Sequence, residues 1–135
     1  MESCKFCKLM DQVDNPDHIV SLEFGKVYLN WNQIYLGRVM YVFKEHLRDI
    51  TEIGVPDLRG AEAEIHKIAC VIRQEFSADL MNVASLGNHV QHLHWHIIPR
   101  YKADVNWGNA PWPHEDRFPD DDEKRSLVQR IRKHF

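Results

Sequence analysis

Three histidines at alternate positions, His92, His94 and His96, are the residues of this chain with the clearest chemical potential. Alternate side chains of a β-strand point to the same face, so this spacing predicts three imidazoles in a row on one side of a strand. Each neutral imidazole carries one donor and one acceptor, and both need partners when the ring is buried. The row therefore indicates catalysis or metal binding, and the alternative is a set of purely structural histidines.

A second group that could do chemistry is the pair Cys4 and Cys7 near the start of the chain. A Cys-x-x-Cys pair can be a redox couple, half of a metal site, or a coincidence. The redox interpretation is the weaker one, because no thioredoxin-like βαβ pattern surrounds the pair. The third cysteine, Cys70, lies between Ala69 and Val71 and is expected to be buried in the core.

Length and charge limit the classes of function that are open to these groups. The chain has 135 residues, which is the size of one domain with a core of its own, here residues 1–135. Its 17 basic and 20 acidic side chains give a net charge of -3, which argues against a nucleic-acid binder with a broad cationic surface. No apolar signal core or membrane-spanning run of ~20 residues is seen, so we expect a cytoplasmic protein without a membrane partner.

The strands that must position the histidines can be identified from runs of β-favouring residues between turn signals. Leu93, Trp95 and Ile97 alternate with the histidines and suit the buried face of a sheet. Gly87 and Asn88 form a turn before this run, so the strands on either side should pair antiparallel. The expected strands cover residues 18–22, 26–30, 38–43, 79–86 and 90–98.

Two helices complete the expected fold. An apolar stripe at helical spacing runs from Pro56 to Phe76. A basic segment at 123–134 follows three aspartates, which is the charge order that a helix dipole favours. The sequence therefore predicts an α+β domain with an antiparallel sheet of about five strands, one long helix and a short C-terminal helix. The stripe of the long helix consists of Leu58, Ala61, Ile65, Ile68, Ala69, Ile72 and Phe76.

The histidine row and several shorter motifs resemble the histidine triad family of nucleotide hydrolases and transferases. The resemblance covers about residues 4–113 and implies the antiparallel sheet of that family. The triad and the Gly-Asn turn before it are the specific part. The accompanying motifs are Cys4-Lys-Phe-Cys7, Leu29-Asn30-x-Asn32-Gln33, Gly37-Arg38, Lys44-Glu45-His46 and Asn82-Val83-Ala84-Ser85-Leu86-Gly87-Asn88.

The resemblance implies a covalent mechanism. The residue that matches the family's nucleophile is His94, which would attack the α-phosphorus of a nucleotide and form a nucleotidyl-histidine that water resolves. Imidazole suits this role because its unperturbed pKa leaves a neutral lone pair at physiological pH. His96 and Asn82 match positions that assist at the phosphate. Because the transferase branch has glutamine where this chain has His96, the resemblance favours hydrolysis.

Further positions match the family's nucleotide contacts. Asn30 matches the residue that holds the ribose hydroxyls, and its amide offers both a donor and an acceptor. Tyr28, Leu29 and Trp31 would border the base, and the alternative is that they are strand core. The resemblance implies a purine nucleotide, with adenine as the base.

Two positions in the turn before the triad, Asn88 and His89, have more than one interpretation. Asn88 matches a position that contacts phosphate or braces the loop, although it is also an ordinary turn residue. The family commonly has a small hydroxyl or apolar residue where this chain has His89. Either the phosphate is contacted differently here, or a further imidazole enters the site, or His89 is a surface histidine. Arg38 replaces a histidine of better-known members, which indicates a different polyphosphate preference.

Some relatives bind zinc with equivalents of Cys4, Cys7, His46 and His92, so the resemblance implies a zinc site here. Four protein ligands close a tetrahedral zinc ion, and such a site is structural. The ion would pin the amino-terminal segment to the sheet and brace the strand that presents His94.

Partners and alternatives complete the expectations. The resemblance implies a homodimer. Trp107 and Trp112, after the triad, are expected either to set the leaving-group preference or to fold back onto the domain. Two other functions stay open: a nucleotide sensor or scaffold without turnover, and a zinc-stabilised interaction module. In the module, His92, His94 and His96 would all bind one metal ion from a single strand. Alternate side chains of a strand are ~6–7 Å apart, so three of them do not readily converge on one ion, which argues against the module.

Overall fold

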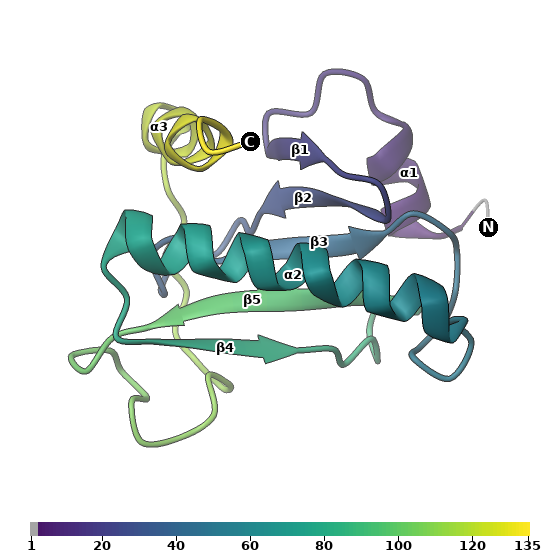
Figure 1. The fold of residues 1–135 in the computed structure, drawn as a ribbon. Helices are drawn as coiled ribbons and strands as arrows, with labels where there is room; N and C mark the ends of the chain where they lie inside the picture. Colours follow the sequence, from purple (N-terminus) through teal and green to yellow (C-terminus); the bar gives the residue numbers. More distant parts are fainter. Residues whose placement is uncertain (1–2) are drawn as a thin grey trace.

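A computed structural model describes residues 3–135 as one antiparallel sheet with three helices (Figure 1). The five strands lie in the order β1-β2-β3-β5-β4, and α2 crosses one face of the sheet. This confirms the predicted α+β fold. The strands are β1 (His18–Ser21), β2 (Gly25–Leu29), β3 (Val39–Phe43), β4 (Leu80–Ala84) and β5 (His94–Arg100), and the helices are α1 (Lys5–Asp11), α2 (Val55–Phe76) and α3 (Asp121–Arg132).

The strand of the histidines begins later than the sequence predicts. We expected it at 90–98, whereas β5 begins at His94 and continues through Pro99 to Arg100. The reason is that Leu93 bonds to the chain after β3: its amide donates to the carbonyl of Leu47 at 2.6 Å. His92 therefore lies before the strand, and β4 likewise ends at Ala84 rather than at residue 86.

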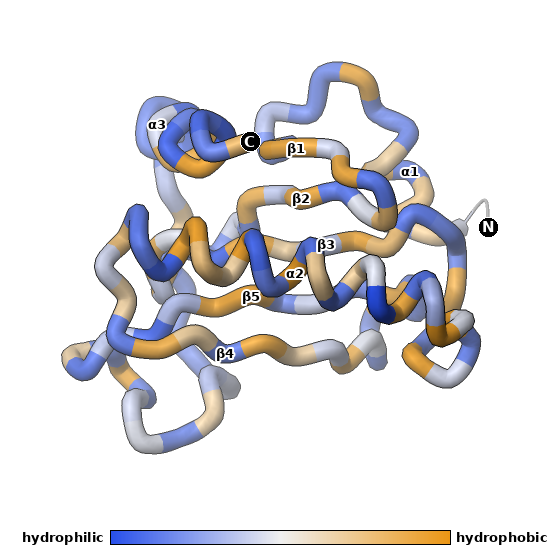
Figure 2. Tube along the Cα trace, in the orientation of Figure 1, coloured by the Kyte–Doolittle hydropathy of each residue, from blue (hydrophilic) through white to orange (hydrophobic). Residues whose placement is uncertain are grey.

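The helices also differ from the expectation. The short helix α1 was not predicted, and it is capped by Cys4, whose sulfur accepts a hydrogen bond from the amide of Cys7. The long helix agrees within one residue, and the C-terminal helix lies two residues earlier than 123–134. Hydrophobic and hydrophilic residues alternate along α2 at helical spacing, as Figure 2 shows.

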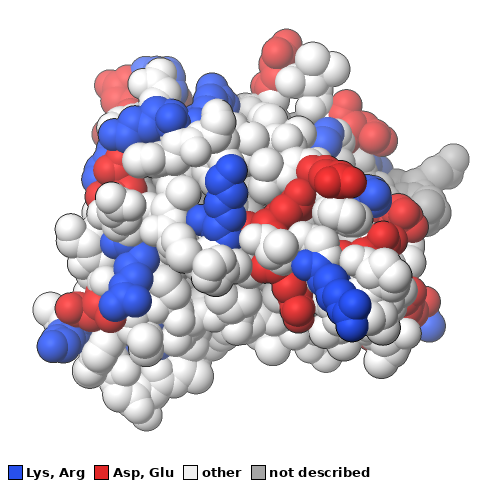
Figure 3. Space-filling view, in the orientation of Figure 1, with Lys and Arg blue, Asp and Glu red and all other residues white. Residues whose placement is uncertain are grey.

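The surface carries charges of both signs. On the face that bears α2, Lys and Arg side chains are mixed with Asp and Glu side chains, as Figure 3 shows. Among residues 3–135, no helix is both long enough and apolar enough to cross a membrane.

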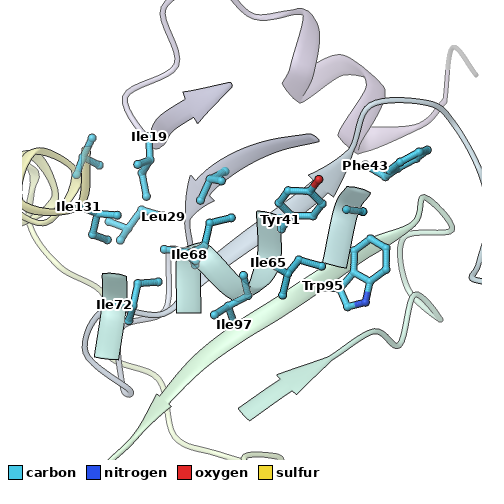
Figure 4. Packing of buried hydrophobic residues seen from close by; sticks show 14 of the residues in the cluster. Ile19, Leu29, Tyr41, Phe43, Ile65, Ile68, Ile72, Trp95, Ile97 and Ile131 are labelled. Atoms are coloured by element: carbon cyan, nitrogen blue, oxygen red, sulfur yellow. The ribbon is translucent and has the colours of Figure 1, made fainter. Parts of the chain in front are cut away.

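The main core lies between α2 and one face of the sheet (Figure 4). Ile65, Ile68 and Ile72 of α2 pack against side chains such as Tyr41 and Ile97 of the central strands. Ile131 of α3 extends this core over β1 and β2. Burial of so much apolar surface is the main force that holds the helices on the sheet.

The opposite face of the sheet carries the chemical groups. Phe6 of α1 packs there in a smaller cluster with Tyr28, Met40 and Val42. Met40 pairs with His96 and Val42 pairs with His94, so both imidazoles rise from this face. Since α1 is only seven residues long, it covers part of the face and leaves room for a cleft.

Gly37 shapes the loop before β3. Its φ of 97° lies in the left-handed region, and a Cβ there would meet Cδ2 of Phe76 at 2.6 Å. The amide of Gly37 donates to the buried side chain of Gln33 at 2.8 Å. The loop therefore enters β3 in one conformation, which places Arg38 against the histidine face.

Cys70 corrects a prediction. We expected it in the core, but it is exposed on the solvent side of α2, where its sulfur lies 3.7 Å from Nε2 of His66. Its apolar neighbours in sequence led to the wrong expectation, because helical spacing turns Cys70 away from Ile68 and Ile72, which face the core.

The core predicts the outcome of a pair of substitutions on α2. Ile68→Ala should lower the free energy of unfolding by about 2–5 kcal/mol, because it removes a fully buried side chain and leaves a cavity. Cys70→Ala, on the exposed side of the same helix, should change it by less than ~0.5 kcal/mol. Urea unfolding measures both, and equal losses for the two variants would contradict this packing.

Candidate functional site

The three histidines of the predicted row do not all lie at one site. His94 and His96 face the same cleft, with ring centroids 5.2 Å apart. His92 precedes the strand and turns its ring toward Cys4, Cys7 and His46. The sequence spacing thus joins two sites: an imidazole pair at the cleft and a metal-type cluster beside it.

The proton of His94 has a fixed position. Its Nδ1 lies 2.6 Å from the carbonyl oxygen of His92, and since a carbonyl only accepts, Nδ1 carries the proton and donates. Nε2 is then the nitrogen with the lone pair. Burial lowers the pKa of His94, so the ring is neutral at physiological pH. The ring of Phe6 lies perpendicular to this ring, at 90°, with the centroids 4.7 Å apart.

His96 carries its proton on the other ring nitrogen from His94. The guanidinium of Arg38 reaches Nδ1 of His96 with its Nη2 at 3.3 Å. A guanidinium only donates, so Nδ1 of His96 accepts and Nε2 carries the proton. Burial, and then the positive charge of Arg38, lower the pKa of His96 to about 3.

Arg38 itself is buried, with 4% of its surface exposed. Its Nη1 donates to Nε2 of His114 at 3.0 Å, and the guanidinium lies 5.4 Å from the ring centroid of Trp112. Burial lowers the pKa of Arg38 to about 10, which still leaves it cationic at neutral pH. Sequence analysis did not identify His114, because a single histidine in an irregular segment shows no pattern.

The cleft over the two imidazoles has a volume of about 540 Å³. Its walls come from α1, from Trp112 and from the loop 86–90, which includes Asn88 and His89. A second pocket of about 370 Å³ lies between α1 and β2 and is lined by residues that include Leu29 and Trp31. Leu29 borders it through the strand itself, because its side chain is buried in the main core on the opposite face of the sheet. Trp31 lines both spaces, so they adjoin.

The structure thus brings most of the predicted nucleotide-binding residues to these two spaces. Tyr28 joins Leu29 and Trp31 in the apolar pocket. The side-chain oxygen of Asn30, by contrast, accepts from the amide of Asn32 at 2.9 Å and so belongs to the turn after β2. Trp107 is exposed, whereas Trp112 lies 5.3 Å from His96 between ring centroids.

Asn82 belongs to a buried polar cluster around Arg100. Its Oδ1 accepts from Nη1 of Arg100 at 2.7 Å. Arg100 also pairs with Asp104 at 2.9 Å, and the two side chains are 2% and 5% exposed. Its Nη2 donates to the carbonyl of Asn106 at 2.6 Å. This cluster, which sequence analysis did not identify, anchors the segment that leads to Trp112.

Cys4, Cys7, His46 and His92 come together as a candidate metal site, with their ligand atoms all within 4.8 Å of one another. Three sulfur-to-nitrogen distances in the cluster are 3.4–3.5 Å. A tetrahedral zinc ion with Zn–S of ~2.3 Å and Zn–N of ~2.0–2.1 Å separates such atoms by roughly 3.6 Å. The residues present therefore fit a zinc ion.

The protonation of His92 agrees with this role. Its Nε2 lies 2.8 Å from the carbonyl oxygen of Phe43 and must donate to it. Nδ1, which faces the cysteine sulfurs, is then free of a proton and can bind a metal. The carbonyl of the same residue holds His94, so one residue connects the two sites.

The family model for the HIT domain, the histidine triad domain, matches residues 27–103, which is more than half of the chain. The chain belongs to the HIT family. The match includes the candidate residues from Tyr28 to His96, whereas Cys4 and Cys7 lie before it.

Relatives support the same assignment. The chain is 27% identical over 126 residues to Protein hit of Bacillus subtilis, covering 90% of this chain and 87% of that protein. It is 27% identical over 89 residues to the bis(5'-nucleosyl)-tetraphosphatase (asymmetrical) of Schizosaccharomyces pombe, covering 62% of this chain and about half, 49%, of that protein. The crystal structure of a zinc-bound histidine triad family protein from Mycobacterium smegmatis is 23% identical, with a TM-score of 0.76 over 98% of this chain and 95% of that one.

The Arg100 cluster predicts a strong effect of one carboxylate. Asp104→Ala should lower the free energy of unfolding by about 3–5 kcal/mol, because it leaves the buried guanidinium without its charge partner. Asp122→Asn breaks an exposed ion pair with Arg125 and should cost less than ~1 kcal/mol. Chemical unfolding measures both, and a loss for Asp104→Ala no larger than for the control would contradict the role of the pair.

Proposed function

We propose that this protein is a nucleotide hydrolase that cleaves at the α-phosphorus of a dinucleoside polyphosphate or nucleoside phosphoramidate and releases a nucleoside monophosphate. The observation that carries the proposal is the fixed proton of His94. Its Nδ1 donates to the carbonyl of His92, so the lone pair of Nε2 is the nucleophile. A membership in the HIT family and a relative that is named as a tetraphosphatase support this choice.

The proposed reaction has two displacements at phosphorus. In the first, Nε2 of His94 forms a bond to the α-phosphorus, and the bond from phosphorus to the leaving group breaks with its electron pair on that group. In the second, water forms the new P–O bond, the N–P bond breaks, and the proton of water passes to solvent. His96 donates its Nε2–H to an oxygen on the phosphate, which stabilises the charge there.

The two adjoining spaces suit the two parts of a nucleotide. We propose that the apolar pocket bordered by Tyr28, Leu29 and Trp31 holds a purine base, with adenine expected, because flat aromatic ligands need such walls. The phosphates would then lie over His94, near the loop with Asn88 and His89.

Two asparagines have more limited proposed roles. Asn30, whose side-chain oxygen is engaged in its own turn, has its amide NH2 group for the ribose hydroxyls. Asn82 likewise has its amide NH2 group for a phosphate oxygen, because its Oδ1 is held by Arg100. A substrate contact by either residue is thus restricted to donation.

We also propose that Cys4, Cys7, His46 and His92 hold a structural zinc ion. When bound, zinc would supply a cross-link between α1 and the start of β5 rather than an activated water, since four protein ligands complete its tetrahedron. This cross-link would hold in place the two residues of α1 that border the cleft, Lys5 and Phe6. The zinc-bound relative from Mycobacterium smegmatis supports this proposal.

A homodimer and a cytoplasmic location remain proposals. The edge strand β4 exposes Leu80 and Val83, with 50% and 47% of their surface accessible, and an apolar sheet edge of this kind favours association.

Removal of the nucleophile tests the function. His94→Ala should lower the release of nucleoside monophosphate from diadenosine tetraphosphate by at least ~10³-fold, because it removes the Nε2 lone pair that attacks the phosphorus in the proposed reaction. Nucleotide binding, measured by calorimetry with a non-hydrolysable analogue, should stay within about tenfold of the wild type. His66→Ala, on the exposed side of α2, is the matched control and should leave turnover unchanged.

The opposite results have clear meanings. Turnover by His94→Ala at the wild-type rate would refute the mechanism. A folded wild type that binds nucleotide and releases no product from any polyphosphate or phosphoramidate would favour the sensor or scaffold.

Metal analysis tests the zinc site. The wild type should carry one zinc ion per chain, and the double variant Cys4→Ser/Cys7→Ser should carry none and melt at a lower temperature. Cys70→Ser, which alters the exposed cysteine, should keep the zinc. Elemental analysis and thermal unfolding give both readouts, and equal zinc contents for the wild type and the double variant would exclude this site.

A further inference from the structure

A buried cation, Arg38, contacts His96, the second imidazole of the cleft. Arg38 lies between His96 and His114 and donates to one nitrogen of each ring, at 3.3 Å and 3.0 Å. His114 in turn donates from Nδ1 to the carbonyl of Glu115 at 2.7 Å, so both ring nitrogens of His114 have partners. Trp112 packs beside both Arg38 and His96. The guanidinium is therefore held in place on several sides.

This contact decides the charge of His96. If His96 carried protons on both nitrogens, its Nδ1 would present a donor to the Arg38 donor, and two buried cations would lie in contact. The other side chains near His96 bring no negative charge: His94 and Trp112 lie beside its ring, and Met40 is its strand partner. His96 is therefore neutral, with its one proton on Nε2.

We propose that Arg38 is a positioning residue that keeps His96 as a neutral hydrogen-bond donor and thereby makes the enzyme select substrates whose leaving group departs as a stable anion. The preferred class is then the phosphoanhydride, such as a dinucleoside polyphosphate, rather than the phosphoramidate. This inference rests on the proposed function and narrows its substrate.

The chemistry of the leaving group supplies the reason. The N–H of a neutral imidazole donates a hydrogen bond but is far too weak an acid to give its proton away. When the α-phosphorus of an anhydride is attacked, the P–O bond breaks and the electron pair stays on a phosphate oxygen, which needs no proton. When a phosphoramidate is attacked, the P–N bond breaks and the nitrogen must gain a proton as it leaves. An imidazolium would supply that proton, and Arg38 prevents one from forming.

Two substrates with the same adenylyl half test this inference. The zinc-replete wild type should cleave diadenosine tetraphosphate with a kcat/KM at least ~10²-fold above that for adenosine 5'-phosphoramidate. In Arg38→His the new imidazole is neutral and can accept as well as donate, so His96 can gain a proton, and this ratio should shrink by at least ~10-fold. Arg38→Lys keeps a cationic donor and should keep the wild-type preference.

A matched control and a direct readout complete the design. Arg48→His, at an exposed arginine that pairs with Glu52, should leave the ratio unchanged. The ¹⁵N shifts of His96 should show a protonated Nε2 and a bare Nδ1 in the wild type near neutral pH. The same spectra of Arg38→His should show the doubly protonated ring as the pH falls.

The possible failures are distinguishable. Equal kcat/KM values for the two substrates in the wild type would overturn the inference and leave the proposed hydrolase intact. An unchanged ratio in folded Arg38→His would do the same, as would a wild-type spectrum with a proton on Nδ1 of His96. Release of product from neither substrate would overturn the proposed function, and the inference with it.

Discussion

The hydrogen bond from Nδ1 of His94 to the carbonyl of His92 is the interaction on which the site depends. It places the lone pair of His94 on Nε2, and without it the buried ring could adopt either tautomer. The bond exists because the chain bends before β5. His92 therefore lies outside the strand, and its carbonyl faces the ring of His94. His92 is also a ligand of the candidate metal cluster, which ties this bend to α1.

The two faces of the sheet divide stability from chemistry. The long helix α2 and α3 bury the main core against one face. The other face is covered only in part by α1, and this leaves a cleft in which partly buried polar groups keep their partners. Burial lowers the pKa of both imidazoles in the cleft, and the carbonyl of His92 and the guanidinium of Arg38 determine which nitrogen of each ring carries the proton. Nε2 of His94 therefore has the lone pair and Nε2 of His96 carries the proton, which is the arrangement that the proposed nucleophile and phosphate donor require.

The sequence predicted what periodicity and short motifs encode. Alternate spacing placed His94 and His96 together on one face, and helical spacing identified α2. It could not show that His92 turns away, because that depends on a hydrogen bond from Leu93 to Leu47, far away in the sequence. The helix α1 was missed because it is short and depends on its contacts with the sheet. Contacts of Arg38 with His114, and of Asn82 with Arg100, join distant segments and leave no local pattern.

The most direct test of the central claim is to catch the covalent intermediate on the wild type. Diadenosine tetraphosphate would be mixed with the enzyme, and the reaction would be quenched within a single turnover at a pH that preserves N–P bonds. Mass spectrometry would then measure the mass of the intact protein and of its peptides. The account predicts a gain of one adenylyl group on His94 that appears before the product and decays as the product forms. Product release with no adduct at any time, or an adduct on another residue such as His89, would contradict the account.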